Sequence, residues 1–320
     1  MTSKLNTVAL ALVLGAVCAS ARADYPERPI QIVVPFAAGS PPDQLARVLA
    51  DSFGPSLGTS VVVQNMAGAA GNIGVAHVAK SAADGYTLVL AGDAAIVVNP
   101  AIYDRLPFDP QRDLAPVSQV AVTPNVLVVG TQVPATSVSA LVALAREQPG
   151  QLAFASAGAG TSSHRAGELL QRQAGIALTH VPYKNSALPD VVGGNVTMFF
   201  ANPATSLPLV RDGKLRALAV SSLRRLSIAP ELPTLAESGF RGFEAVAWFG
   251  LLAPAGTPPA VLKRLQAETA RALAQPAMRD KLAAMGAEPV GSTPEEFVRL
   301  IASETPKWAQ LMKAAGIKAD

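Results

Sequence analysis

The stretch "IQIVVPFAAGSPPDQLARVL" (residues 30–49) joins an apolar run to an amphipathic run through a turn of small residues. "IQIVVPF" predicts a buried strand, and the spacing of Leu45, Val48, Leu49 and Phe53 predicts a helix with one apolar face. The same order of strand, turn and helix recurs along the chain, which is the pattern of an α/β protein. Continuous apolar strands of this kind are buried on both faces, so they predict a parallel sheet covered by helices.

The recurrence falls into two groups. The first runs to the strand "YTLVLAG" (86–92), and the order restarts at "NVLVVG" (125–130). One more strand, "AVAWFGLLAP" (245–254), is followed only by helical patterns. No linker rich in Pro, Gly or Ser separates the groups, so we expect two closely coupled lobes. The space between two such lobes is a default place for a small ligand.

The first 23 residues have the layout of a secretory signal peptide. A basic start precedes an apolar run (8–17) too short to span a bilayer, and Ala21–Ala23 ends the segment with small residues. We expect cleavage before Asp24 and a periplasmic product. Lipid attachment at Cys18 is the alternative, although the residues before it match a lipoprotein box poorly. Because Cys18 is the only cysteine, the mature chain does not rely on disulfides.

Composition excludes several classes of protein. The formal net charge is +3, and removing the two cations of the signal peptide lowers it to +1, so there is no electrostatic footprint for nucleic acid. No later stretch reaches eighteen apolar residues, which argues against a membrane span. The three histidines, His77, His164 and His180, form no His-x-x-x-His motif, so we expect no metal site and no cofactor.

Two stretches share the design of a strand, a small-residue turn and a helix start. The second of them is "FASAGAGTSSHRAGELL" (154–170). A helix start has unpaired N–H groups and partial positive charge, which suit a carboxylate or a phosphate. The helix dipole contributes only about 0.3–1 kcal/mol, whereas micromolar binding requires about 8 kcal/mol. One turn is therefore too weak, and two turns that face each other make a plausible clamp.

Each turn also has a purely local explanation. Ser40 can cap the first helix, with Pro41 at the first helical position and Asp43 bonding back to the Ser40 N–H as in a capping box. Thr161 or Ser162 can cap the second helix in the same way.

Catalytic signals are weak. "GTSSH" is not a nucleophile elbow, because His164 stands where the second glycine belongs. An exported serine hydrolase or esterase that uses Ser162 or Ser163 with His164 is the alternative function, although no orienting acid lies near this dyad. His180 lies in an apolar strand and is expected to be a satisfied core residue.

Ordered blocks along almost the whole chain, from Tyr25 to Lys318, strongly resemble the Bug family. These proteins are the extracytoplasmic solute receptors of tripartite tricarboxylate transporters. The blocks include "YPERPIQIVVPFAAGSPPDQLAR" (25–47), "GNIGVAHVAKSAADGYTLVLAG" (71–92), "GAGTSSHRAGEL" (158–169), "PTLAESGFRGFEAVAWFGLLAPAGTP" (233–258) and "TPEEFVRLI" (293–301).

The resemblance implies a type II periplasmic-binding-protein fold, in which two α/β lobes joined by two crossing strands close on a ligand cleft. Lobe one would be 24–122 plus 248–320, lobe two would be 123–247, and "NVLVV" and "FGLLAP" would be the crossovers. The expected function is non-enzymatic: a monomeric receptor captures a small carboxylate and delivers it to the permease subunits. A receptor that serves a signalling partner instead of a permease is a further alternative.

The resemblance also implies a set of ligand-binding residues. Asp43 is expected to shape the first turn more than to touch an anion, which it would repel. The set comprises Ala38, Gly39, Ser40 and Asp43 from lobe one, Gly158, Thr161 and Ser162 from lobe two, and Asp93 and Asn202 from the cleft walls.

Two departures from the family pattern bear on the ligand. Pro41 and Pro42 remove two N–H donors from the first helix start, so this turn has fewer backbone bonds to offer. After "GGNVTMF" (193–199), relatives commonly continue with Phe-Asp, whereas this chain has Phe200-Ala201-Asn202. If that acid meets an ammonium group, its loss favours a di- or tricarboxylate or an aromatic acid over an amino acid.

Overall fold

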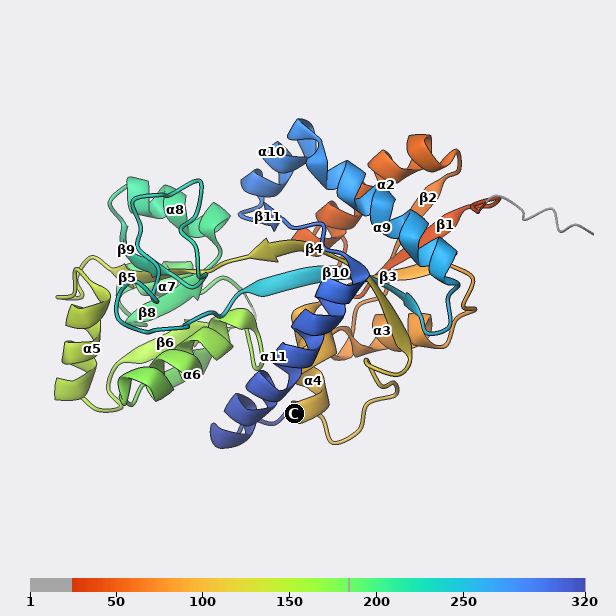
Figure 1. The fold of residues 1–320 in the computed structure, drawn as a ribbon. Helices are drawn as coiled ribbons and strands as arrows, with labels where there is room; N and C mark the ends of the chain where they lie inside the picture. The colour runs from red at the N-terminus through yellow and green to blue at the C-terminus, as the bar shows by residue number, and fades with distance from the viewer. Residues whose placement is uncertain (1–24, 184, 320) are drawn as a thin grey trace, which may run out of the picture.

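Two β-sheets organise the chain, and each is flanked by its own helices (Figure 1). The computed structural model describes residues 25–183 and 185–319. The expected signal peptide and Cys18 lie outside these residues. None of the described helices is both long enough and apolar enough to cross a membrane.

The first sheet has the strand order β11-β4-β10-β3-β1-β2. Strands β1, β2 and β3 are parallel, whereas β10 is antiparallel to both β3 and β4. We call this sheet and its helices the first lobe. The bounds are β1 (Ile30–Val34), α2 (Pro41–Leu57), β2 (Val61–Asn65), η1 (Ala69–Gly71), α3 (Asn72–Ala79), β3 (Thr87–Gly92), η2 (Ala94–Val98), α4 (Asn99–Ile102), β4 (Leu114–Thr123), β10 (Ala247–Pro254), α9 (Pro259–Ala274), α10 (Pro276–Ala284) and β11 (Glu288–Pro289).

The second sheet has the order β7-β6-β8-β5-β9. Its strands β6, β7 and β8 are parallel, and β5 is antiparallel to its neighbours β8 and β9. We call this sheet and its helices the second lobe. The bounds are β5 (Val126–Gly130), α5 (Val138–Glu147), β6 (Ala153–Ser156), α6 (Ser162–Ala174), β7 (Thr179–Pro182), α7 (Leu188–Gly193), β8 (Met198–Ala201), α8 (Pro203–Arg211) and β9 (Leu215–Val220).

The chain crosses between the lobes at two neighbouring places. β4 and β10 pair antiparallel along their length, from Leu114 opposite Pro254 to Thr123 opposite Ala247, so that β4 leads toward the second lobe and β10 returns from it (Figure 1). The long helix α11 (Pro294–Ala314) lies along this junction and contacts β4 and α4 of the first lobe and α6 of the second. The two lobes are thus joined by paired strands and a shared helix.

Two expectations from the sequence need correction. The expected parallel arrangement holds for β1–β3 and for β6–β8, but β10 and β5 run antiparallel to their neighbours. All five residues of β5 are buried, so an apolar run reports burial on two faces and not strand direction. The sequence reasoning also missed β4, which lies directly before the expected crossover "NVLVV" and forms the crossing together with β5 and β10.

Close packing explains one glycine at the junction. A Cβ atom built on Gly250 of β10 would lie 2.1 Å from Cζ of Phe297, the aromatic residue in the first turn of α11. Phe297 also meets the Trp248 ring edge to face, with 5.2 Å between the ring centroids. Glycine at this position therefore lets α11 lie directly on the strand that joins the lobes.

Candidate ligand site at the boundary between the lobes

Hydrogen bonds to the buried side chain of Asp43 hold the first small-residue turn, between β1 and α2, in shape. Asp43 is only 2% exposed, and its carboxylate accepts hydrogen bonds from the Gly39 N–H (2.8 Å) and from Asn65 Nδ2 (2.9 Å). Arg47 Nε donates to the same carboxylate at 3.0 Å. Burial alone would raise the pKa of Asp43, but the hydrogen bonds from Arg47, Gly39 and Asn65 outweigh it and lower the pKa. Asp43 therefore shapes the turn as a carboxylate.

The expected capping box at this helix start is wrong. Ser40 is the N-cap residue of α2, but its hydroxyl donates to the Ala37 carbonyl (2.6 Å) and makes no side-chain cap bond. Asp43 bonds to the N–H of Gly39 and not to that of Ser40. Gly39 has φ +81°, a backbone conformation that glycine favours. With this conformation, the N–H of Gly39 faces the Asp43 carboxylate in place of the N–H of Ser40.

Most of the first turn is exposed to solvent. Ala37, Ala38 and Gly39 are exposed, and Ser40 is half-buried. The internal donors of the turn are Gly39 and Ser40; within residues 25–183 and 185–319, the N–H groups of Ala37 and Ala38 have no acceptor, which leaves them for a ligand. The two prolines at the start of α2 remove N–H donors there, so the donors that this turn can offer to a ligand come before the helix in the chain.

The second turn, between β6 and α6, is tied together by hydroxyl groups. Thr161 is the N-cap residue of α6, but its hydroxyl donates to the Gly158 carbonyl (2.7 Å) and makes no cap bond. The Ser163 hydroxyl accepts from the Ala157 N–H at 3.0 Å. Of the two N-cap candidates from the sequence, Thr161 and Ser162, the first is the N-cap residue, but the expected side-chain bond is absent. Ser162, at the first helical position, is half-buried, as are Thr161 and Gly158.

A pair of stacked histidines supports the second turn from inside. The rings of His164 and His180 lie 3.8 Å apart and are nearly parallel, with an angle of 7° between them. The Gly160 N–H donates to His164 Nδ1 (3.1 Å), and His180 Nε2 lies 2.6 Å from the Ser156 hydroxyl. Burial and the neighbouring His164 lower the pKa of His180 to about 4. His180 therefore stays neutral at neutral pH, and the stacked pair of rings buttresses the turn.

The contacts of this arrangement occupy His164, the histidine that a serine hydrolase would need as a base. Within the second lobe as far as it is described, the ring of His164 bonds to the Gly160 N–H and lies 3.6 Å from Glu168, and no hydrogen bond joins it to Ser162 or Ser163. Neither serine has the base at hydrogen-bond distance that nucleophilic catalysis requires.

Residues 92–98, which include Asp93, lie between the first turn and the second. It directly follows β3, and a Cβ on its neighbour Gly92 would lie 3.1 Å from Cζ of Phe36 in the first turn. The Asp93 carboxylate forms an ion pair with Arg165, which lies one turn into α6. A Cβ on Gly160 of the second turn would lie 3.1 Å from Val98, just beyond Asp93 in the chain. The two turns and Asp93 thus form one continuous region across the boundary between the lobes.

Asn202 also lies at the boundary, but its side chain is occupied. Asn202 Oδ1 caps α8 by accepting from the Ala204 N–H (2.8 Å), and Nδ2 donates to the Met285 carbonyl of the first lobe (3.4 Å). Both ends of the amide therefore bond to protein, one in each lobe.

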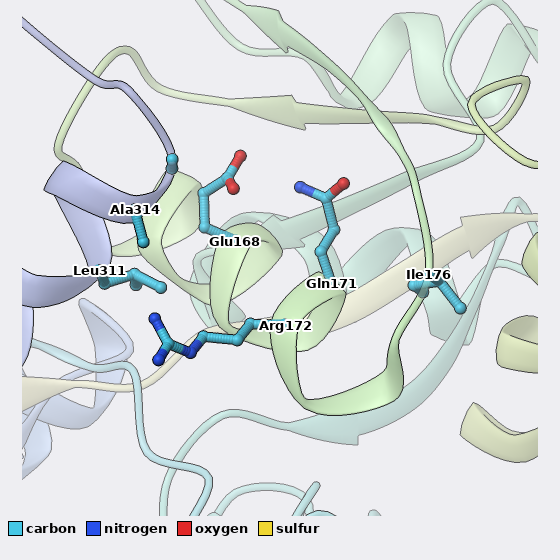
Figure 2. Close-up of a pocket in the computed structure, with 7 residues that line it drawn as sticks. Glu168, Gln171, Arg172, Ile176, Leu311 and Ala314 are labelled. Atoms are coloured by element: carbon cyan, nitrogen blue, oxygen red, sulfur yellow. The ribbon is translucent and has the colours of Figure 1, made fainter.

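The groove shown in Figure 2 is not the predicted site. It has a volume of about 300 Å³ and lies between the C-terminal half of α6 and the end of α11, whereas the second turn lies at the opposite end of α6. It is lined by Glu168, Gln171, Arg172, Ile176, Leu311, Ala314 and Ala315.

The sequence reasoning missed two residues that organise the site. Asn65, at the end of β2, bonds to both Asp43 and the Phe36 carbonyl (3.2 Å). Arg165 has no exposed surface, although an arginine at a helix start normally faces solvent. Its partner Asp93 is 72 residues away in the chain, so no local pattern could have indicated the pair.

The fold and this boundary site define a two-lobed α/β binding protein. A family model described as "Tripartite tricarboxylate transporter family receptor" matches residues 45–317. The protein BugT of Bordetella pertussis is 40% identical over 322 residues, covering 99% of each chain. The chain therefore belongs to the tripartite tricarboxylate transporter receptor family, as the resemblance implied.

Solved structures agree with this assignment. An R. palustris protein with adipate shares 37% identity and a TM-score of 0.79, covering 92% of this chain and 99% of its own. MatC from Rhodopseudomonas palustris with bound malate shares 31% identity and a TM-score of 0.74, covering 90% and 99%. The periplasmic binding protein BugD shares 35% identity and a TM-score of 0.75, covering 92% and 100%. The expected two-lobe fold is confirmed.

Proposed function

We propose that the protein is a non-enzymatic receptor that captures a small carboxylate between its two lobes and hands it to a tripartite transporter. The observation that carries this proposal is the pair of turns after β1 and β6, which lie on either side of residues 92–98 at the boundary between the lobes. Ala37 and Ala38 supply free N–H groups on one side, and the start of α6 supplies them on the other. The adipate and malate bound by two structural neighbours have the same chemistry.

The electrostatics of the site favour an acid without an ammonium group. The two carboxylates next to the turns, Asp43 and Asp93, are already paired with Arg47 and Arg165. A ligand ammonium would therefore compete with an arginine for either one, and Asn202 supplies no charge. Di- or tricarboxylates and aromatic acids are the ligand classes we expect, bound mainly by backbone N–H groups.

Several finer parts of the proposal rest on the sequence and on family membership. Residues 1–23 are removed as a signal peptide, and the mature protein works in the periplasm as a monomer. Lobe one comprises 24–122 and 248–320, and lobe two comprises 123–247. The partners are the membrane permease subunits, and there is no nucleic acid partner.

A thermal-shift screen of carboxylic acids tests the ligand class, because a ligand that binds only the folded state raises the melting temperature. The acid that gives the largest shift is then titrated against the Thr161→Val/Ser162→Ala double variant. We expect at least a tenfold loss of affinity, about 1.4 kcal/mol or more, because the turn loses the hydroxyl that bonds to Gly158.

The matched control is Ser137→Ala, which removes the hydroxyl that caps α5 in the same lobe through the Ala140 N–H (3.1 Å). This variant should lose stability and keep its affinity. Unaltered affinity in the double variant would mean that the second turn is only a helix start. Turnover of an ester that disappears with Ser162 would contradict the receptor function itself.

A further inference from the structure

A buried ion pair joins the two lobes at their junction. Arg165 of α6 has no exposed surface and Asp93 is 5% exposed. Arg165 Nη2 bonds to the Asp93 carboxylate and also donates to the Val246 carbonyl at 3.2 Å. Val246 lies immediately before β10, on the segment that returns the chain to the first lobe. One guanidinium nitrogen thus holds the second lobe to the first lobe and to the crossing segment.

The shared helix α11 completes this contact. The Arg165 guanidinium lies 4.4 Å from the centroid of the Trp308 ring, and the Lys307 ammonium lies 4.3 Å from the same ring. Lys307 also donates to the Glu244 carbonyl of the crossing segment at 2.8 Å. Cation–π contacts of this kind strengthen when they are desolvated. Trp308 therefore contributes to the attraction between α6 and α11.

Several donors of the buried Arg165 side chain lack a hydrogen-bond partner within the described parts of the chain, which would not be expected if its only role were to stabilise the fold. Among the described residues, Arg165 Nε, Arg165 Nη1 and Trp308 Nε1 are buried donors with no hydrogen-bond partner. Apolar residues of similar volume often stabilise a fold more than a buried ion pair does, whereas removing one partner of such a pair is strongly unfavourable. The pair therefore penalises any packing of the lobes in which Asp93 does not meet Arg165.

We propose that Asp93 and Arg165, with Val246 and Trp308, form an interlobe latch that selects the arrangement of the lobes seen here before any ligand binds. When the lobes separate, Arg165 becomes hydrated, and closing the lobes is favourable only if Asp93 arrives at the guanidinium. The latch goes beyond the proposed function, because it sets the angle between the lobes in ligand-free protein.

The test is small-angle scattering of ligand-free protein together with tryptophan emission. Trp248 and Trp308 are the two tryptophans of the chain, and both are fully buried beside the latch. In Asp93→Asn, Arg165 loses its ion pair with Asp93, which should shift the ratio of separated lobes to the arrangement seen here by about a hundredfold or more. We expect a larger radius of gyration and a red-shifted emission maximum.

Arg165→Lys is the milder variant, because it keeps the charge and loses the bond geometry, and it should shift both values in the same direction by less. Glu237→Gln is the control, since it breaks the exposed Glu237–Arg225 pair within the second lobe and should change neither value. A folded Asp93→Asn or Arg165→Lys variant with the wild-type radius of gyration and emission would overturn the latch. Loss of folding in Asp93→Asn leaves the decision to Arg165→Lys.

Discussion

Replacing Asp43 by asparagine tests whether the first turn is preformed by a single carboxylate. The substitution keeps the shape of the side chain but exchanges one acceptor oxygen for an NH₂ group. Three donors meet this carboxylate: the Gly39 N–H at 2.8 Å, Asn65 Nδ2 at 2.9 Å and Arg47 Nε at 3.0 Å. The one acceptor oxygen of an asparagine can bond to only part of these donors. Its NH₂ group would then face a remaining donor, to which it cannot hydrogen-bond.

The size of the effect follows from the exposure of each partner. The Arg47 side chain is 52% exposed and returns to water, so its share of the loss is small. One donor, on Gly39 or on Asn65, is left without its acceptor beside a buried side chain, which costs about 1–3 kcal/mol. We therefore expect Asp43→Asn to lower the free energy of unfolding by about 2 kcal/mol.

Chemical denaturation and calorimetric titration measure the two consequences separately. Ligand affinity should fall about tenfold, because the N–H groups of Ala37 and Ala38 lose their fixed orientation. Arg47→Gln is the matched control, because it leaves the carboxylate and its bonds to Gly39 and Asn65 in place, and it should change each value by less than half as much. An Asp43→Asn variant with wild-type stability and wild-type affinity would refute the role assigned to Asp43.

Two further predictions concern stability. Because the pKa of His180 is lowered to about 4 in the folded protein, the unfolded chain takes up this proton first. The free energy of unfolding should therefore fall as the pH drops from about 6.5 toward 4, and His180→Gln should flatten this decline in denaturation curves. Gly250→Ala should lower the free energy of unfolding by about 3 kcal/mol, since its Cβ would lie 2.1 Å from Phe297. Gly54→Ala, in the interior of α2 where the nearest atom is 3.4 Å away, should raise it by about 0.5–1 kcal/mol. Equal effects of the two alanines would refute the packing argument.

The sequence predicted the α/β class, the two lobes and the two turns because these follow from local patterns. Apolar runs, helix periodicity and small-residue turns each span fewer than twenty residues. Strand direction did not follow, as β5 and β10 show, because burial looks the same in parallel and antiparallel neighbours. β4 was missed because only part of its length is fully buried, so its pattern is mixed.

The parts of the site that the sequence did not predict depend on contacts between distant residues. Arg165 meets Asp93 across 72 residues, and Asn65 meets Asp43 across 22. The local expectation for the helix caps failed for a related reason. The hydroxyls of Ser40 and Thr161 bond to carbonyls within the turns, and the cap positions carry no side-chain bond.

The central claim is that both turns bind one carboxylate ligand at the lobe boundary. Amide chemical shifts of ¹⁵N-labelled protein, titrated with the best acid from the thermal-shift screen, test this claim most directly. The account predicts that the signals of Ala37 and Ala38 and those of Ser162 and Ser163 move together and saturate at one ligand per chain. Shifts confined to one lobe, or to the groove around Glu168 and Arg172, would contradict it.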